Sequence, residues 1–157
     1  MKQHIEWKDL RETETEIIIK LLEYSAKEDG EEDVVFDRKI LTFNIDKMKN
    51  EIEDLDPFRY LQGAFISMCE WLTVGKMIEI LRDMFDGIEI TPHNNLHIGY
   101  TIGSLYPDGI NFNPVQIYSS PKWLKEDHTK EENDKYYDEV FCNSLWEAVK
   151  YVLKEES

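Results

Sequence analysis

His93 and His97 are the side chains whose type and spacing come closest to a metal site, because imidazole is the commonest protein ligand for transition metals. A spacing of four residues brings two rings to one face of a helix, but Pro92, Asn94 and Asn95 instead predict a turn between two strands. No cysteine lies near them, and a transition-metal site needs several ligands in a fixed geometry. The rings could still meet across a hairpin, but we interpret them as solvated turn residues and expect no metal.

Local catalytic and cofactor motifs are missing from the sequence. Residues 73–76, Thr-Val-Gly-Lys, resemble the end of a phosphate-binding loop, but Glu70 stands where the first glycine is needed and Met77 where Mg²⁺ needs Ser or Thr. The dinucleotide, serine-hydrolase, zinc-protease and dithiol redox patterns do not occur. We therefore expect no cofactor, assign no catalytic residue, and favour a protein that is not an enzyme.

Carboxylates are the chemical group that this sequence holds in clear excess. The 157 residues include 33 Asp and Glu against 18 Lys and Arg, so the formal charge is −15. Affinity for nucleic acid comes mainly from cations that displace the counterions of the phosphates, so we expect no direct binding of nucleic acid. The acids gather in three groups: Glu28, Asp29, Glu31, Glu32 and Asp33; Glu51, Glu53, Asp54 and Asp56; and Glu126, Asp127, Glu131, Glu132, Asp134, Asp138 and Glu139.

The third group has aromatic residues between its acids, and aromatic anchors mixed with charge are typical of interface hot spots. One interpretation is a recognition surface for a basic protein, because opposite charges speed the encounter of two proteins. The other is a solvated surface with half-buried aromatic side chains. The residues that we predict to contact a partner are Trp123, Glu126, Asp127, Glu131, Glu132 and Tyr137.

Three functions follow from these features. The first is a non-enzymatic acidic binding protein that docks a basic, nucleic-acid-acting partner, as inhibitors and toxin-neutralising immunity proteins of this size and charge do. The second is a small-ligand-binding protein or enzyme with its site between a sheet and a long connection over residues 119–138, since such connections are often lids. Its pocket residues would be His93, His97, Tyr100 and Tyr118. The third is an acidic mimic of DNA, and a homodimer stays open.

The first half of the chain reads mainly as helices. Apolar spacing predicts one over residues 9–27 that ends at Gly30. β-branched residues predict extended structure at 34–36 and 40–43, either as two strands joined by a turn at residues 37–39 or as one bent strand. Asn44 is the expected N-cap of a short helix. Asp56-Pro57 predicts the start of the next helix. The change of apolar phase near Gly75 predicts either a kink in that helix or a second helix that abuts it, ending at Asp86-Gly87. The expected apolar stripes are Leu10, Ile17, Leu21 and Tyr24; Ile45, Met48, Ile52 and Leu55; Phe58, Leu61, Phe65, Met68 and Leu72; and Val74, Met77, Ile78, Leu81 and Phe85.

From Ile88 the apolar period changes to two, which predicts a hairpin and a third strand over 110–117. Asn143 or Ser144 is the expected cap of a C-terminal helix. The fold class predicted is α+β: a single domain over residues 1–157, with an antiparallel three- to four-stranded meander sheet covered by helices from the N-terminal half and a C-terminal helix.

Two features of the sequence bear on the cellular compartment of the protein. No apolar leader or membrane-length apolar run occurs, so we expect no membrane association. The two cysteines, Cys69 and Cys142, lie far apart, and we interpret them as small buried hydrophobes. Together these features predict a cytoplasmic protein.

Overall fold

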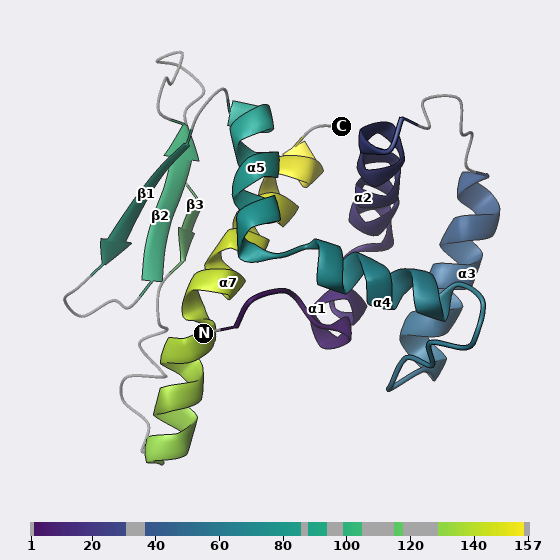
Figure 1. The fold of residues 1–157 in the computed structure, drawn as a ribbon, viewed down its shortest axis with the longest axis horizontal. Coiled ribbons are helices and arrows are strands. Elements are labelled where there is room, and N and C mark those ends of the chain that lie inside the picture. The colour runs from purple at the N-terminus through teal and green to yellow at the C-terminus, as the bar shows by residue number, and fades with distance from the viewer. Residues whose placement is uncertain are drawn as a thin grey trace. The chain divides into compact units, whose positions relative to one another are not determined.

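The computed structural model describes residues 2–30, 37–85, 88–93, 99–104, 115–117 and 129–155 (Figure 1). Its contacts divide the chain into two compact units. One, the sheet unit, contains Met1–Ile5 and Trp71–Glu156, and the other, the helical unit, contains Glu6–Glu70 and Ser157. The single domain expected over 1–157 stays a prediction.

The helical unit holds α1 (Trp7–Arg11), α2 (Thr15–Glu28), α3 (Arg38–Glu51) and most of α4 (Gln62–Trp71). Helices α2 and α3 pack on each other. Leu10, Ile17 and Leu21 are buried as predicted, and Tyr24 is half-buried. The single helix predicted over residues 9–27 is wrong, because Leu10 belongs to α1 and the other three residues to α2. The other buried apolar side chains of this unit are Ile18, Ile19, Ala26, Ile45, Met48, Phe65, Met68 and Cys69.

Helix α2 ends as expected, because Gly30 adopts a φ of 80°, a left-handed conformation that glycine tolerates best. The next element differs from the prediction. The Asp37 carboxylate accepts hydrogen bonds from the backbone N–H groups of Lys39 (3.1 Å) and Ile40 (3.2 Å), so α3 starts at Arg38. The expected strand at 40–43 and the expected cap at Asn44 are therefore wrong. The expected strand at 34–36 lies outside the described residues.

Arg38 joins α3 to α2 at their exposed surface. Its guanidinium donates to the carboxylates of Glu16 and Glu23, and the hydrogen bond with Glu16 raises the pKa of Arg38. Because all three side chains are partly exposed, these ion pairs orient the two helices more than they stabilise them.

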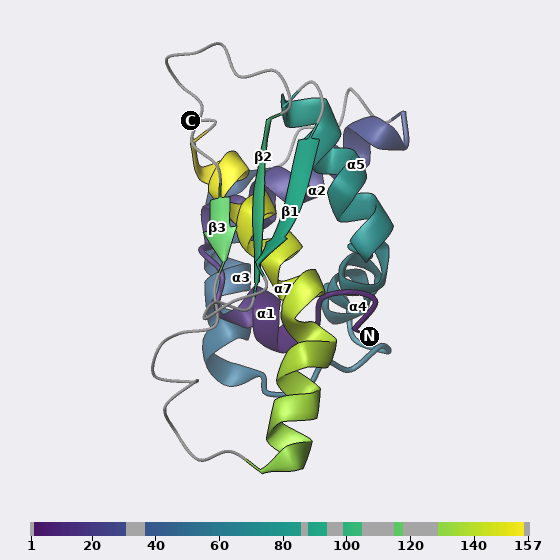
Figure 2. The same cartoon turned by 90° about the vertical axis from the view of Figure 1, so that its left-hand side faces the viewer.

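The sheet unit contains α5 (Val74–Phe85), β1 (Ile88–His93), β2 (Gly99–Ser104), β3 (Val115–Ile117) and α7 (Lys130–Glu155). The strands form an antiparallel sheet in the order β1-β2-β3, with Ile90 opposite Ile102 and Tyr100 opposite Ile117. Helix α5 contacts β1, and α7 contacts β2 and β3. Both helices lie on the same side of the sheet in Figure 1, and α7 passes behind the strands in Figure 2.

The predicted α+β fold class is wrong, because most of the described residues are helical and β1, β2 and β3 form only a small antiparallel meander within the sheet unit. The strands described span only a few residues each, and segments expected to be extended or irregular are helices. Residues 40–43 belong to α3 and residues 130–138 to α7. The physical reason is that their backbone hydrogen bonds are satisfied within a helix, which needs no partner strand.

Helix α7 begins much earlier than the apolar pattern indicated. The Thr129 hydroxyl accepts a hydrogen bond from the Glu132 N–H at 3.1 Å and so caps its first turn. Ser144 lies buried inside the helix and donates to the carbonyl of Val140 at 2.7 Å. The predicted cap at Asn143 or Ser144 is therefore wrong, and so is the connection over 119–138 where it includes residues 130–138.

Both cysteines are buried, as predicted. In the ranges that the structure covers, every helix is too short or too polar to serve as a membrane span.

Candidate functional site

The residues predicted to contact a partner are only partly described. Glu131 and Glu132 are exposed in the first turn of α7, where carboxylates interact favourably with the helix dipole. Tyr137 lies further along α7, and its side chain is not described. Trp123, Glu126 and Asp127 lie outside the described residues, so this group stays a prediction.

The predicted pocket residues are likewise only partly described. His93 ends β1 opposite Gly99, and Tyr100 follows on β2 opposite Pro92. Their side chains are not described, and His97 and Tyr118 lie outside the described residues. Within the described ranges, no group of His, Cys, Asp or Glu side chains could hold a metal ion.

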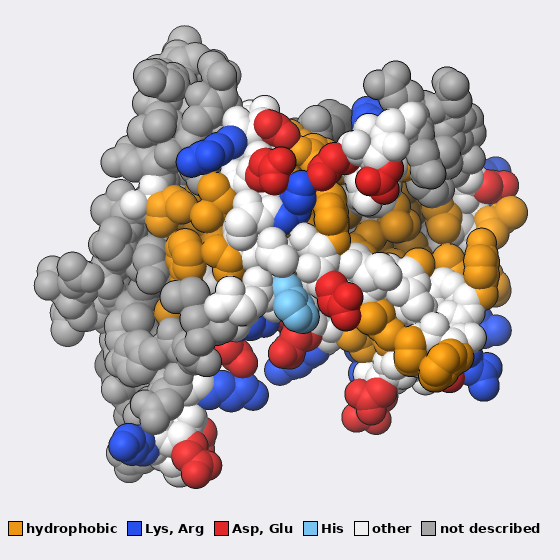
Figure 3. Space-filling view, viewed as in Figure 1, with side chains coloured by type: hydrophobic (Ala, Val, Ile, Leu, Met, Phe, Trp, Pro, Cys, Tyr) orange, Lys and Arg blue, Asp and Glu red, His pale blue; other side chains and the backbone are white. Residues whose placement is uncertain are grey.

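Two exposed aromatic side chains mark a surface that the sequence did not reveal. Phe58 and Tyr60 are 95% and 94% exposed, the highest values among the large hydrophobic side chains of the described residues. They lie between α3 and α4, in residues 56–63, which we call the aromatic turn. Figure 3 shows hydrophobic side chains over the part of the helical unit where α3 and this turn lie. Removing apolar side chains from water lowers the free energy. A partner that covers Phe58 and Tyr60 would therefore gain this free energy on binding.

Side-chain hydrogen bonds hold the aromatic turn in one conformation. The Asp56 carboxylate accepts from the Phe58 N–H at 2.9 Å, and the Gln62 side-chain oxygen accepts from the Asp56 N–H at 2.9 Å. The Arg59 N–H donates to the Asp56 carbonyl at 3.2 Å, and its guanidinium lies 3.5 Å from the carboxylate. An ordered turn loses less conformational entropy on binding than a flexible one.

The backbone of the turn also explains why α4 starts late. Leu61 has a φ of 69°, a left-handed value that interrupts a helix and is unfavourable for a bulky residue. The chain folds back so closely that a Cβ added at Gly63 would lie 2.9 Å from the Pro57 carbonyl oxygen. Asp56-Pro57 therefore starts a turn rather than the predicted helix, which begins at Gln62. As a result, Phe58 leaves the apolar stripe on which Phe65 is buried.

The second group of acids precedes the aromatic turn and shares Asp56 with it. Residues 51–61 contain four carboxylates, Glu51, Glu53, Asp54 and Asp56, and one cation, Arg59. The first three carboxylates are exposed and Asp56 is half-buried. The segment that carries Phe58 and Tyr60 therefore has a net charge of 1 − 4 = −3.

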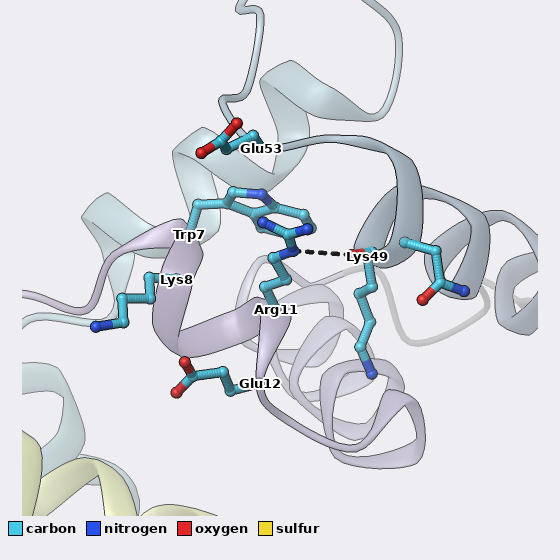
Figure 4. Close-up of a pocket in the computed structure, with 7 residues that line it drawn as sticks. Trp7, Lys8, Arg11, Glu12, Lys49 and Glu53 are labelled. Atoms are coloured by element: carbon cyan, nitrogen blue, oxygen red, sulfur yellow. Dashed lines mark hydrogen bonds between the residues drawn. The ribbon is translucent and has the colours of Figure 1, made fainter.

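A second feature of the helical unit is a cleft of about 550 Å³ beside α1 (Figure 4). It is lined by Trp7, Lys8, Arg11 and Glu12 on one side and by Lys49, Asn50 and Glu53 on the other. The Trp7 indole N–H donates to the Ile52 carbonyl at 3.1 Å, and the Arg11 Nε–H donates to the Lys49 carbonyl at 2.9 Å. The volume lies in the range of small-molecule sites.

The positive charges of this cleft are not equivalent. The Lys49 ammonium donates to the Thr13 carbonyl and to the Thr15 hydroxyl, so it is engaged within the protein. Arg11 is half-buried, and its terminal nitrogens have no acceptor in the part of the chain that the structure describes. Lys8 is exposed. Arg11 is thus the cation best placed to meet a bound group.

No family model, curated protein or solved structure matches this chain. The chemistry of the two features can still be compared. The aromatic turn offers exposed apolar area in a segment with net negative charge, which fits a macromolecular surface. The cleft is concave and offers an indole ring with a guanidinium, which fits a small molecule.

Proposed function

We propose that this chain is a non-enzymatic cytoplasmic binding protein that docks a basic, nucleic-acid-acting protein through an acidic surface, as an inhibitor or immunity-type protein. The observation that carries the proposal is the exposure of Phe58 and Tyr60, at 95% and 94%, on a hydrogen-bonded turn that follows three carboxylates and contains a fourth, Asp56. The formal charge of −15 supports the choice of a basic partner.

The aromatic side chains supply affinity in this proposal. Aromatic anchors that enter a pocket of the partner are frequent hot spots, where truncation costs about 2 kcal/mol or more, roughly 30-fold in Kd. Phe58 and Tyr60 make few contacts in the unbound protein, so nearly all of their apolar surface is available to a partner. The fixed turn keeps the cost of ordering them low.

The carboxylates increase the association rate with a basic partner and the selectivity for it. Charges at the rim of an interface act mainly on the association rate and on its salt dependence, because salt screens them. They also repel nucleic acid and other acidic proteins. The predicted contacts at Trp123, Glu126, Asp127, Glu131, Glu132 and Tyr137 stay a separate hypothesis about the same partner.

The proposal is tested by affinity capture from the source cell with three baits: the natural protein, the double variant Phe58→Ser/Tyr60→Ser, and Tyr151→Ser. Tyr151 is the matched control, because it is also an exposed aromatic residue but lies on α7. We expect the natural protein and the control to retain the same basic protein, released by high salt, and the double variant to lose it.

The partner is then purified, and its Kd is measured for each variant. A loss of at least about 30-fold for the double variant, with no change for Tyr151→Ser, supports the proposal. Capture of the same protein by all three baits, or of no basic protein by any, contradicts it.

A further inference from the structure

We propose that the cleft beside α1 binds a small aromatic monocarboxylate, with its carboxylate on Arg11 and its ring against Trp7. The proposal does not rest on the docking surface proposed above, since Trp7 and Arg11 carry it and only Glu53 belongs to both. The cleft lies on the helical unit, and its charged and aromatic lining residues are Trp7, Lys8, Arg11, Glu12, Lys49 and Glu53.

Arg11 provides the anion-binding group. Its Nε–H donates to the Lys49 carbonyl at 2.9 Å, which holds the guanidinium at the end of α1. Its terminal nitrogens have no acceptor within the described ranges. A planar guanidinium offers paired N–H groups in the geometry that matches the two oxygens of a carboxylate. Since the side chain is half-buried, that interaction is less screened by water than one on the open surface.

Trp7 provides a flat apolar wall. The hydrogen bond from its indole N–H to the Ile52 carbonyl and its contact with the Phe65 ring, with centroids 5.9 Å apart, hold the indole in place. The indole is only half-buried, and it still lines the cleft. An aromatic ring binds such a surface more favourably than an aliphatic chain of similar size. The reason is that stacked or edge-to-face rings interact favourably in addition to burying apolar surface.

The acids of the cleft restrict the charge of the ligand. Glu53 lies beyond Trp7 and Glu12 lies near Lys8, at the margins of the group drawn in Figure 4. The Lys49 ammonium keeps its charge, but its N–H groups already donate to Thr13 and Thr15. The lining holds three cations, Lys8, Arg11 and Lys49, against the carboxylates of Glu12 and Glu53, a net charge of 3 − 2 = +1. That charge matches a single carboxylate on Arg11, whereas the several negative charges of a nucleoside triphosphate exceed it and also meet a chain of formal charge −15.

The test is a titration of the full chain with sodium benzoate at constant ionic strength, followed by the indole N–H resonance of Trp7 in a ¹H–¹⁵N spectrum. That resonance is assigned by its loss in Trp7→Phe. We expect a saturable shift with a Kd on the order of 1 mM, as is typical of a ligand with so few atoms. Inorganic phosphate and ATP are expected to give no saturable shift at the same concentrations.

Two variants make the assignment specific. Arg11→Lys keeps the charge but removes the fork of donors, and it is expected to weaken benzoate binding at least about 10-fold. Arg82→Lys is the matched control on α5 and is expected to change nothing. Glu53→Gln removes an opposing charge from an exposed site and is expected to tighten binding about two- to fivefold, which tests the geometry without altering Arg11.

The proposal is overturned by the absence of a saturable shift up to about 20 mM benzoate, about twenty times the expected Kd. It is equally overturned if Arg11→Lys, with an unchanged melting temperature, binds as tightly as the natural protein. If Arg11→Lys does not fold, the result with Glu53→Gln decides: tighter binding supports the site, and unchanged or weaker binding refutes it.

Discussion

Gly63 and Gly75 are both the second residue of a helix, α4 and α5 respectively, yet the structure predicts opposite effects when each is replaced by alanine. A Cβ added at Gly63 would lie 2.9 Å from the Pro57 carbonyl oxygen, closer than real Cβ contacts. A Cβ added at Gly75 would meet nothing nearer than the Thr73 hydroxyl oxygen at 4.0 Å. Only the first substitution must displace backbone, and that backbone belongs to the aromatic turn.

The expected magnitudes follow from two opposing effects. Replacing glycine by alanine in a helix stabilises it by up to about 1 kcal/mol, mainly through the entropy of the unfolded chain. Forcing a backbone apart by the size of a methyl group costs about 1–3 kcal/mol. Gly75→Ala should therefore gain up to about 1 kcal/mol, and Gly63→Ala should show a net loss of about 1–2 kcal/mol.

Differential scanning calorimetry measures both effects. For a chain of this size, 1 kcal/mol corresponds to about 2–4 °C in Tm, so Gly75→Ala should raise Tm by up to about 4 °C and Gly63→Ala should lower it by about 2–8 °C. A Gly63→Ala protein that melts at or above the natural protein would refute the reasoning, because helix propensity alone would then explain both variants.

Three further outcomes test the fold. Asp37→Ala removes the cap of α3 and should cost about 1 kcal/mol by urea unfolding, whereas Asp37→Asn should cost little; equal losses would contradict the capping role. Ile18→Ala empties a site that is 0% exposed and should cost about 2–5 kcal/mol in the same assay, so a loss below about 1 kcal/mol would argue against a packed core there. Phe58→Ser should change the free energy of unfolding by less than about 0.5 kcal/mol, since the ring contacts mainly solvent, and a larger loss would show that it is not exposed.

Apolar spacing predicted the helices well where one face is buried. Met77 and Leu81 of α5 are buried as expected, and the chain breaks between α4 and α5 where the stripe changes phase. The same reasoning was wrong for residues 40–43, whose β-branched and aromatic residues look like a strand. There the buried positions are Ile45 and Met48, whereas Ile40 and Phe43 are 59% and 67% exposed. In the sequence alone, exposed apolar residues of a helix give the same pattern as the apolar residues of a strand.

The start of α7 was missed for the opposite reason. Residues 130–138 show no apolar period, although Thr129 caps them and acids occupy the first turn. The cap residue was visible in the sequence, but without an apolar face the pattern gave no reason to prefer a helix. Ser144 looked like a cap because serine favours that position, yet it is buried within the helix.

The candidate sites were not predictable from local patterns. Phe58 lies seven residues before Phe65, the spacing of one helix face, and so it was expected in the core. The left-handed backbone at Leu61 removes it from that face. The cleft joins Trp7 and Arg11 to residues about forty positions later in the chain, and no short motif links segments so far apart.

The sequence by itself determined the charge of −15, the stop of α2 at Gly30 and the buried face of α5, because each depends only on composition or on residues within a few positions of one another. The tertiary structure alone decided that Phe58 and Tyr60 face solvent and that Arg11 lies beside Trp7 in a cleft. Both depend on the path of the backbone between helices, which one left-handed residue or one close backbone approach can redirect.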